Sequence, residues 1–182
     1  MFAARFVLLF LVFTGLAAYA SPIEIENRAD GSNVLDIVSA LQVSDSRILA
    51  QLNSLASAGQ ANVANITPLI DDLVGTLNTA STSFNTLGPV DDSKGPSKQD
   101  VANAFAPIIR EIALTLTAVE NLVPGLAPLL PTLGMDAALH QALLGLDIVL
   151  PGVVELVAAL LFDVCGILRK LGFTLTVLLL GF

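Results

Sequence analysis

The first half of the chain alternates apolar and polar positions with the period of an α-helix. Between residues 33 and 58, apolar side chains recur at spacings of three and four, which is typical of a helix with one buried face. This stripe is interrupted once, by Asp45, and consists of Val34, Val38, Leu41, Ile48, Leu52 and Leu55. Gly59 suits the left-handed position that follows a helix, so we expect this helix to end near Ala58.

A second stripe follows and is more regular than the first. Its members keep the alternation of three and four without interruption: Val63, Ile66, Ile70, Leu73, Leu77, Ala80, Phe84 and Leu87. A stripe of this kind packs against neighbouring helices at a shallow angle. Proline is tolerated in the first turn of a helix, so Pro68 fits a helix that begins near Asn65 or Thr67. The alternative is that Pro68 kinks a longer helix.

A polar loop and a third helix come next. Residues 88–97 are rich in Gly, Pro, Asp and Ser, which predicts a loop. Ser97 and Asp100 have the spacing of a capping box, so they predict the start of the third helix, and we expect Pro107 to bend it. Its stripe, with Thr115 at one core position, comprises Val101, Phe105, Ile108, Ile112, Val119 and Leu122. The charged positions that we expect to face solvent are Arg110, Glu111 and Glu120.

The second half of the chain, residues 124–182, is far more apolar. Three prolines between residues 124 and 131 interrupt any long helix, and residues 134–150 then predict a fourth helix capped by Asp136. Pro151 begins a fifth helix. At about 100° per residue its charged side chains share a strip about 120° wide: Glu155, Asp163, Arg169 and Lys170.

The apolar face of this last helix is the candidate for contact with a hydrophobic surface. We assign to it Leu156, Leu160, Val164, Phe173, Leu175, Leu178 and Leu179. A wide apolar face beside a narrow polar strip suits either burial in a bundle or adsorption at an interface. The segments together predict an all-α fold, a helical bundle of about five helices with a very hydrophobic C-terminal helical hairpin.

The N-terminal residues have the layout of a secretory signal peptide. Arg5 precedes an apolar core that ends near Gly15, and a small-x-small sequence precedes Ser21. The alternative is an uncleaved anchor, which the short apolar core disfavours. The predicted organisation is therefore a signal peptide (1–20), a flexible acidic N-terminus (21–32), an amphipathic helical half (33–123) and a hydrophobic helical half (124–182).

Composition narrows the classes of function. Hydrophobic residues make up 54% of the chain and charged residues 13%, about half the usual share of charge. A formal net charge of −8 excludes nucleic acid and disfavours anionic membranes, because both require basic patches. The chain has a single cysteine, Cys165, so no intramolecular disulfide can form. A buried thiol is favoured over an intermolecular bridge at this position.

No group of residues predicts a reaction, a metal site or a cofactor, so we expect that the protein is not an enzyme. His140 is the only histidine and has no catalytic partner in the sequence pattern. Asp91 and Asp92 lack the regularly spaced oxygen ligands of a calcium loop. Asn65 belongs to the one N-glycosylation sequon, although Pro68 after the sequon disfavours its use.

A membrane-inserted or lipid-binding protein is the alternative to a surface-adsorbing one. A bilayer-spanning helix needs about 20 apolar residues, and a window over residues 151–170 would enclose Glu155 and Asp163. Residues 171–182 provide only about twelve, which is short of a span. A simple transmembrane helix in this region is therefore disfavoured.

The layout of the chain resembles that of small secreted, cysteine-poor wall and matrix proteins of filamentous basidiomycete fungi. The resemblance rests on the leader that ends Ala-Tyr-Ala, on a helical half rich in Ser, Thr, Asn and Ala, as in residues 33–37 and 79–84, and on the strongly hydrophobic second half. The first half more loosely resembles the fungal hydrophobic-surface-binding proteins. Hydrophobins themselves are excluded, because they depend on several disulfides.

The resemblance implies a structural role beside hydrophobins, in aerial hyphae and in attachment. We therefore expect a secreted amphiphilic protein of the cell wall or extracellular matrix. Its expected partners are hydrophobic surfaces, wall components or further copies of itself.

Overall fold

The computed structural model describes residues 31–90 and 95–182, which are largely helical and contain no β-strand. The elements are α1 (Gly31–Ser57), α2 (Val63–Leu87), α3 (Lys98–Glu120), α4 (Leu129–Thr132), α5 (Met135–Val149), α6 (Val153–Leu161), a 3-10 turn η1 (Phe162–Val164), α7 (Cys165–Lys170) and α8 (Thr174–Leu179). The predicted all-α fold is confirmed. The predicted signal peptide, most of the predicted acidic N-terminus, and Asp91 and Asp92 lie outside the described residues.

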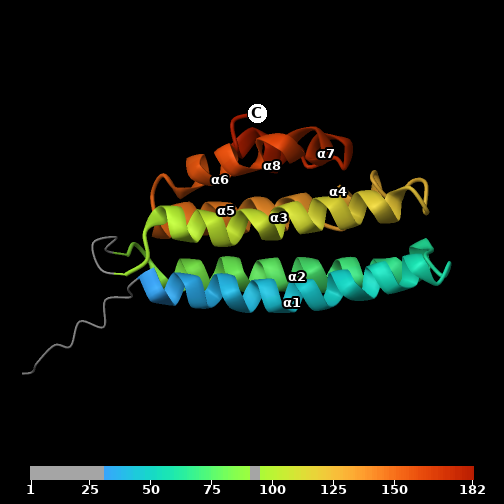
Figure 1. The fold of residues 1–182 in the computed structure, drawn as a ribbon, viewed down its shortest axis with the longest axis horizontal. Helices are drawn as coiled ribbons and strands as arrows, with labels where there is room; N and C mark the ends of the chain where they lie inside the picture. The colour runs from blue at the N-terminus through green and yellow to red at the C-terminus, as the bar shows by residue number, and fades with distance from the viewer. Residues whose placement is uncertain (1–30, 91–94) are drawn as a thin grey trace, which may run out of the picture.

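The helices form three stacked layers (Figure 1). α1 and α2 make the first layer, α3 and α5 the middle layer, and α6, α7 and α8 the third. α1 packs on α2 and α3, and α2 packs on α5, so these helices form a four-helix unit. On the far side of the middle layer α6 packs on α3, and α8 packs on α5. The middle layer is consequently covered on two faces.

The predicted stripes account for the buried faces of α1 and α2 and for part of that of α3. In α1 every stripe position except the half-buried Leu55 is buried, and in α2 the positions from Ile66 to Phe84 are all buried. The exceptions lie at helix ends: Val63 is 43% exposed in the first turn of α2, and Leu122 is 56% exposed beyond α3. α2 begins earlier than predicted because Asn62 caps it, its side chain accepting a hydrogen bond from the Asn65 N–H at 3.0 Å.

The capping box that opens α3 is confirmed. Ser97 Oγ accepts a hydrogen bond from the Asp100 N–H at 3.2 Å, and the Asp100 carboxylate accepts one from the Ser97 N–H at 3.0 Å. The hydrogen bond from the Ser97 side chain also lowers the pKa of Asp100. α3 therefore starts where the sequence predicts.

α3 has a second buried stripe that periodicity did not single out. Eleven of its 23 residues are buried, against seven of 25 in α2, so α3 is covered over a wider arc. On a helical projection the buried residues span about 180°, of which the predicted stripe occupies less than half. The second stripe consists of Ala102, Ala106, Ile109, Ala113 and Leu116. The three alanines of this stripe are small and allow α6 of the third layer to pack closely on α3.

The prediction of one long last helix is wrong, because this part of the chain forms three short helices, α6, α7 and α8. A 3-10 turn interrupts it after Leu161, and Gly172 ends α7 with a φ of 82°. The N–H of Phe173 bonds to the carbonyl of Leu168 at 3.0 Å, which is the hydrogen bond of a Schellman motif. The four charges of the predicted polar strip are nevertheless all exposed, at Glu155, Asp163, Arg169 and Lys170.

The sequence predicted that Asp136 caps its own helix, and this prediction is wrong. Gly134 occupies the N-cap of α5, and Asp136 is buried in the first turn. Its carboxylate instead accepts hydrogen bonds from the N–H groups of Leu175 (2.8 Å) and Thr176 (3.0 Å), and from the Thr176 hydroxyl (2.8 Å). These N–H groups belong to the first turn of α8, where a helix has no internal partners for its donors. Asp136 thus caps α8 from a different layer.

Candidate functional site

Large apolar side chains are exposed on the outer face of the third layer. Phe162 is 79% exposed, Leu178 75% and Leu175 47%. The ring of Phe162 meets that of Phe182 edge to face, with centroids 6.2 Å apart. We call these four residues, Phe162, Leu175, Leu178 and Phe182, the outer patch. Water is a poor solvent for such a group, because Phe162 and Leu178 leave most of their apolar area exposed.

Local backbone structure positions the outer patch. Leu175 and Leu178 are three residues apart on α8 and so lie on one face of that helix. After α8, Gly181 adopts a φ of 76° and the Phe182 N–H bonds to the carbonyl of Val177 at 3.2 Å. This Schellman motif folds the chain back after α8 and fixes Phe182 beside it, where its ring contacts Phe162.

The structure divides the predicted contact residues into three groups. Leu175 and Leu178 are exposed, whereas Leu156, Leu160 and Leu179 are half-buried against the core. Val164 is 3% exposed and Phe173 is fully buried, so the assignment of these two to an accessible surface is wrong in this structure. Val164 lies opposite Glu155 on the helical projection, so the face assigned to adsorption is there the face that is buried in the protein. Phe173 falls on the side of Glu155 in that projection, and the turn at Gly172 changes its direction.

Phe162 was missed although the sequence carried a signal for it. On the projection of the last helix it falls about 20° from Glu155, inside the strip of charged residues. Because the charged residues face solvent, a large aromatic residue on the same face of the helix should also be exposed. Phe182 carried no periodic signal, because it lies beyond the last helical turn.

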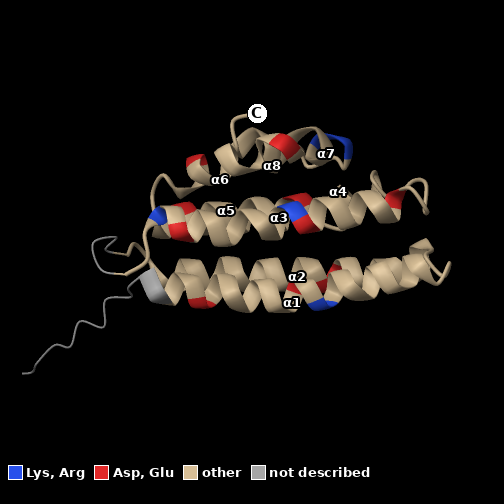
Figure 2. Ribbon diagram, viewed as in Figure 1, with Lys and Arg blue, Asp and Glu red and all other residues tan. Residues whose placement is uncertain are grey.

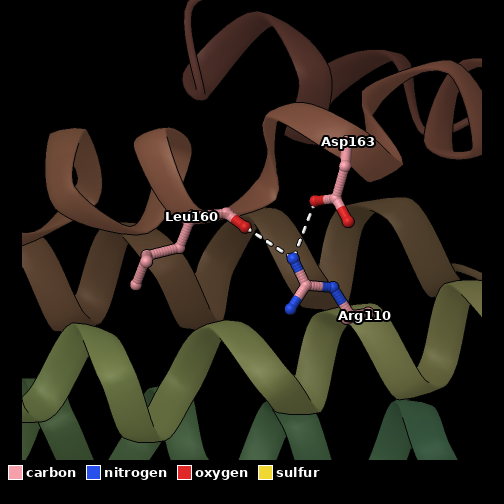
Figure 3. Close-up of polar contacts among 3 residues, drawn as sticks. All are labelled: Arg110, Leu160 and Asp163. Carbon is pink, nitrogen blue, oxygen red and sulfur yellow. Dashed lines mark hydrogen bonds and ion pairs between the residues drawn. The ribbon is translucent and has the colours of Figure 1, made fainter.

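Arg110 of α3 connects the middle layer to the third layer (Figure 3). Its Nη2 donates one hydrogen bond to the carbonyl of Leu160 at 2.8 Å and another to Oδ1 of Asp163 at 2.7 Å. α6 ends at Leu161, so the Leu160 carbonyl is one of the last-turn acceptors that a helix leaves without an internal donor. The hydrogen bond from Arg110 holds the pKa of Asp163 below its usual value. Arg110 is therefore an interlayer contact and is only half-buried, rather than the free solvent-facing residue that we expected.

Charged side chains are sparse along the helices (Figure 2), and α8 carries none. Among the described residues, no three His, Cys, Asp or Glu side chains gather as a metal site. His140 and Cys165 are half-buried. Asn65 is exposed, and its side-chain amide donates to the carbonyl of Gln60 at 2.9 Å.

One described helix, α3, is long and apolar enough to cross a membrane by length and composition alone. Just over half of that stretch (56%) is buried inside the protein, because α3 lies in the middle layer. Residues 151–182, where the sequence suggested a membrane hairpin, contain no described helix longer than the nine residues of α6.

The chain is similar to a protein of a basidiomycete fungus. It is 34% identical over 76 residues to "Fruiting body differentiation protein 16" of Flammulina velutipes, which corresponds to 40% of this chain and 59% of that protein. The chain thus spans a little over half the length of this relative. No protein-family model matches it. The similarity is consistent with a fungal developmental protein.

Proposed function

We propose that this protein is a secreted, noncatalytic structural protein of the fungal wall or extracellular matrix that adsorbs to hydrophobic surfaces through its outer patch. In this role it supports aerial hyphae and attachment. The observation that carries the proposal is the exposure of Phe162 and Leu178, which both belong to the third layer. The leader sequence and the similarity to a fruiting-body protein support the compartment and the biological setting.

The outer patch provides a moderate driving force. Complete burial of a Phe or Leu side chain contributes about 1.5–3 kcal/mol, so at 79% and 75% exposure these two residues contribute together about 2–5 kcal/mol on a hydrophobic solid. α8 carries no charge, so no ion has to be desolvated beside Leu178, and Asp163, the charged neighbour of Phe162, is paired with Arg110. We infer that the patch makes the first contact with the surface.

Adsorption to polystyrene or to oil droplets tests the proposal with purified protein. The double variant Phe162→Ser with Leu178→Ser should lower the affinity by tenfold or more, since about 1.4 kcal/mol corresponds to a factor of ten. Both side chains are exposed, so the variant should keep the stability of the native fold.

Val43→Ser is the matched control, because Val43 is 73% exposed on α1 in the first layer, on the opposite side of the molecule. Its adsorption should equal that of the unmodified protein. If the double variant and the control adsorb alike, the contact surface lies elsewhere and the proposal fails.

Fractionation of the producing cells tests the compartment. Recovery from the medium or the wall, with an N-terminus near Ser21, supports secretion. Recovery only in detergent, from a carbonate-resistant membrane fraction, would instead favour the membrane-inserted alternative. That result would overturn the wall and matrix assignment.

A further inference from the structure

We propose that the third layer, α6 to α8, opens away from α3 and α5 when the protein meets a hydrophobic surface, and that the faces uncovered in this way form the main adsorbing surface. This inference rests on the proposed function, because it describes how the same protein would enlarge its contact. The outer patch would dock first. Opening would then replace contacts between the two layers with contacts to the surface.

The interface beneath the third layer contains many more apolar side chains than the outer patch. Its side from α6, η1, α7 and α8 contributes Val153, Val154, Val157, Leu161, Val164, Leu168, Leu171, Phe173, Val177 and Leu180, all of them buried. The opposing helix α3 contributes its second stripe, which ends in Leu116. In water the exposure of these faces is unfavourable, whereas a hydrophobic phase supplies the apolar contacts that opening removes.

The third layer is the part of the fold that local structure stabilises least. α6 has nine residues and α7 and α8 have six each, whereas α1, α2 and α3 have 27, 25 and 23. Helices this short do not persist in water without tertiary packing. The layer therefore depends on its contacts with the middle layer for its helical structure.

Two polar contacts hold the layer closed, one at each of the middle-layer helices. Arg110 of α3 binds the carbonyl of Leu160 and the carboxylate of Asp163. Asp136 of α5 caps α8 through the N–H groups of its first turn. Contacts of this type depend on geometry and are lost together once the layers separate.

The connection between the middle and third layers provides a hinge. The chain passes from α5 to α6 through residues 150–152, where Gly152 has a φ of 87°. Asp147 steadies this turn, since its Oδ1 accepts a hydrogen bond from the Gly152 N–H at 2.9 Å. Rotation about these few residues moves α6 to α8 as one unit.

The four-helix unit has an interior of its own and can stay folded while the third layer opens. The stripes of α1 and α2 and the first stripe of α3 are largely buried, α1 packs on α2 and α3, and α2 packs on α5. Gly145 of α5 also allows close approach to α2: a Cβ placed on Gly145 would lie 3.2 Å from that of Phe84. Opening therefore requires no unfolding of the first two layers.

Distances between pairs of spin labels test the proposal on the full chain. One pair joins Ala50→Cys on α1 to Ala159→Cys on α6, in a background with Cys165→Ser, since both alanines are exposed. In water the pair spans about two interhelical spacings, or roughly 20 Å between helix axes. On oil droplets we expect this distance to at least double.

A second pair, Ala50→Cys with Asn78→Cys on α2, reports on the four-helix unit, and its distance should stay unchanged. Adsorption with both distances unchanged would overturn the opening and leave the proposed function in place. Lengthening of both pairs means general unfolding and also overturns it. Failure of the protein to adsorb at all would instead refute the proposed function.

Loosening one of the two polar contacts gives an independent test. Asp136→Asn removes an acceptor from the cap of α8 and should raise the rate of the distance change on droplets at least threefold. Asp71→Asn is the matched control, because it makes the same chemical change at an exposed position of α2. Equal rates for the two variants would show that the cap does not hold the layer closed, and would overturn this part of the proposal.

Discussion

Replacement of Asp45 by asparagine should stabilise the protein near neutral pH and remove part of its pH dependence. Asp45 lies at a core position of α1 and is 1% exposed. One carboxylate oxygen accepts a hydrogen bond from the Thr76 hydroxyl of α2, and the other, Oδ2, is buried without a partner. From α3, Glu111 adds a negative charge. Asparagine keeps the shape and the Thr76 hydrogen bond but removes the buried charge.

The size of the effect follows from the pKa of this carboxyl group. Burial raises the pKa of Asp45 from 3.8 to about 6; the Thr76 hydrogen bond partly opposes this change, and Glu111 adds to it. At about 1.36 kcal/mol per pKa unit, the charged form destabilises the fold by about 3 kcal/mol relative to the protonated form. The folded protein holds this proton more tightly than the unfolded chain. The contribution of the protonated Asp45 to the free energy of unfolding is therefore fully present below about pH 4 and is lost as the pH rises through about 6.

Urea unfolding followed by circular dichroism measures the difference between the two proteins at each pH. This difference cancels the contribution of the other carboxylates, such as Asp100 and Asp163, whose lowered pKa values act in the opposite direction. The free energy of unfolding of Asp45→Asn, relative to that of the unmodified protein, should increase by about 2–3 kcal/mol as the pH rises from about 4 to about 7.5. Glu111→Gln should reduce the pH dependence only in part. A difference that does not change with pH would refute the account of Asp45 as a buried acid.

Three further substitutions should raise or lower the free energy of unfolding, and unfolding measurements can check each. Gly75→Ala should stabilise the protein by about 1 kcal/mol, because a Cβ there, in the middle of α2, would have no atom within 4 Å; a lower urea midpoint would contradict this. Gly145→Val should destabilise it by about 2–3 kcal/mol through overlap with Phe84, and an unchanged midpoint would show that α2 and α5 can separate freely. Asp136→Asn should cost about 1–2 kcal/mol and speed amide exchange at Leu175, whereas unchanged exchange would argue against the cap.

Periodicity was sufficient to predict the buried faces of α1 and α2. A single strong stripe identifies the buried face of a helix, and in α2 the positions from Ile66 to Phe84 are buried as predicted. The same pattern marked Asp45 as an acid at a core position before its surroundings were known. The signal is reliable there because each of α1 and α2 has one covered face, as expected for the outer helices of a layered bundle.

The middle layer was harder to predict, because a helix covered on two faces has a weak period. The second stripe of α3 is mainly alanine, for example Ala106 and Ala113, and alanine is common on exposed and buried helix faces alike. The sequence therefore gave no reason to place another layer on that side. This omission is the reason why the hydrophobic second half was expected to expose more apolar surface than it does.

The polar contacts of the third layer could not be predicted from local pattern at all. Asp136 precedes its partner Leu175 by 39 residues, and Arg110 lies 53 residues from Asp163. Near the start of a helix an aspartate matches the pattern of a local cap, and an arginine beside a glutamate matches a solvent face. Only the packing of the layers shows that both residues serve a different helix.

The cap that Asp136 provides to α8 also has a consequence for the order of folding. A six-residue helix does not nucleate alone, and the donors of its first turn have their acceptor on α5. α8 can therefore form only after α5 is in place, through contacts between distant parts of the chain, which are slow to form. Until then Val177, Leu178 and Leu180 remain accessible to other unfolded chains, so the yield of refolding should fall steeply as the protein concentration rises.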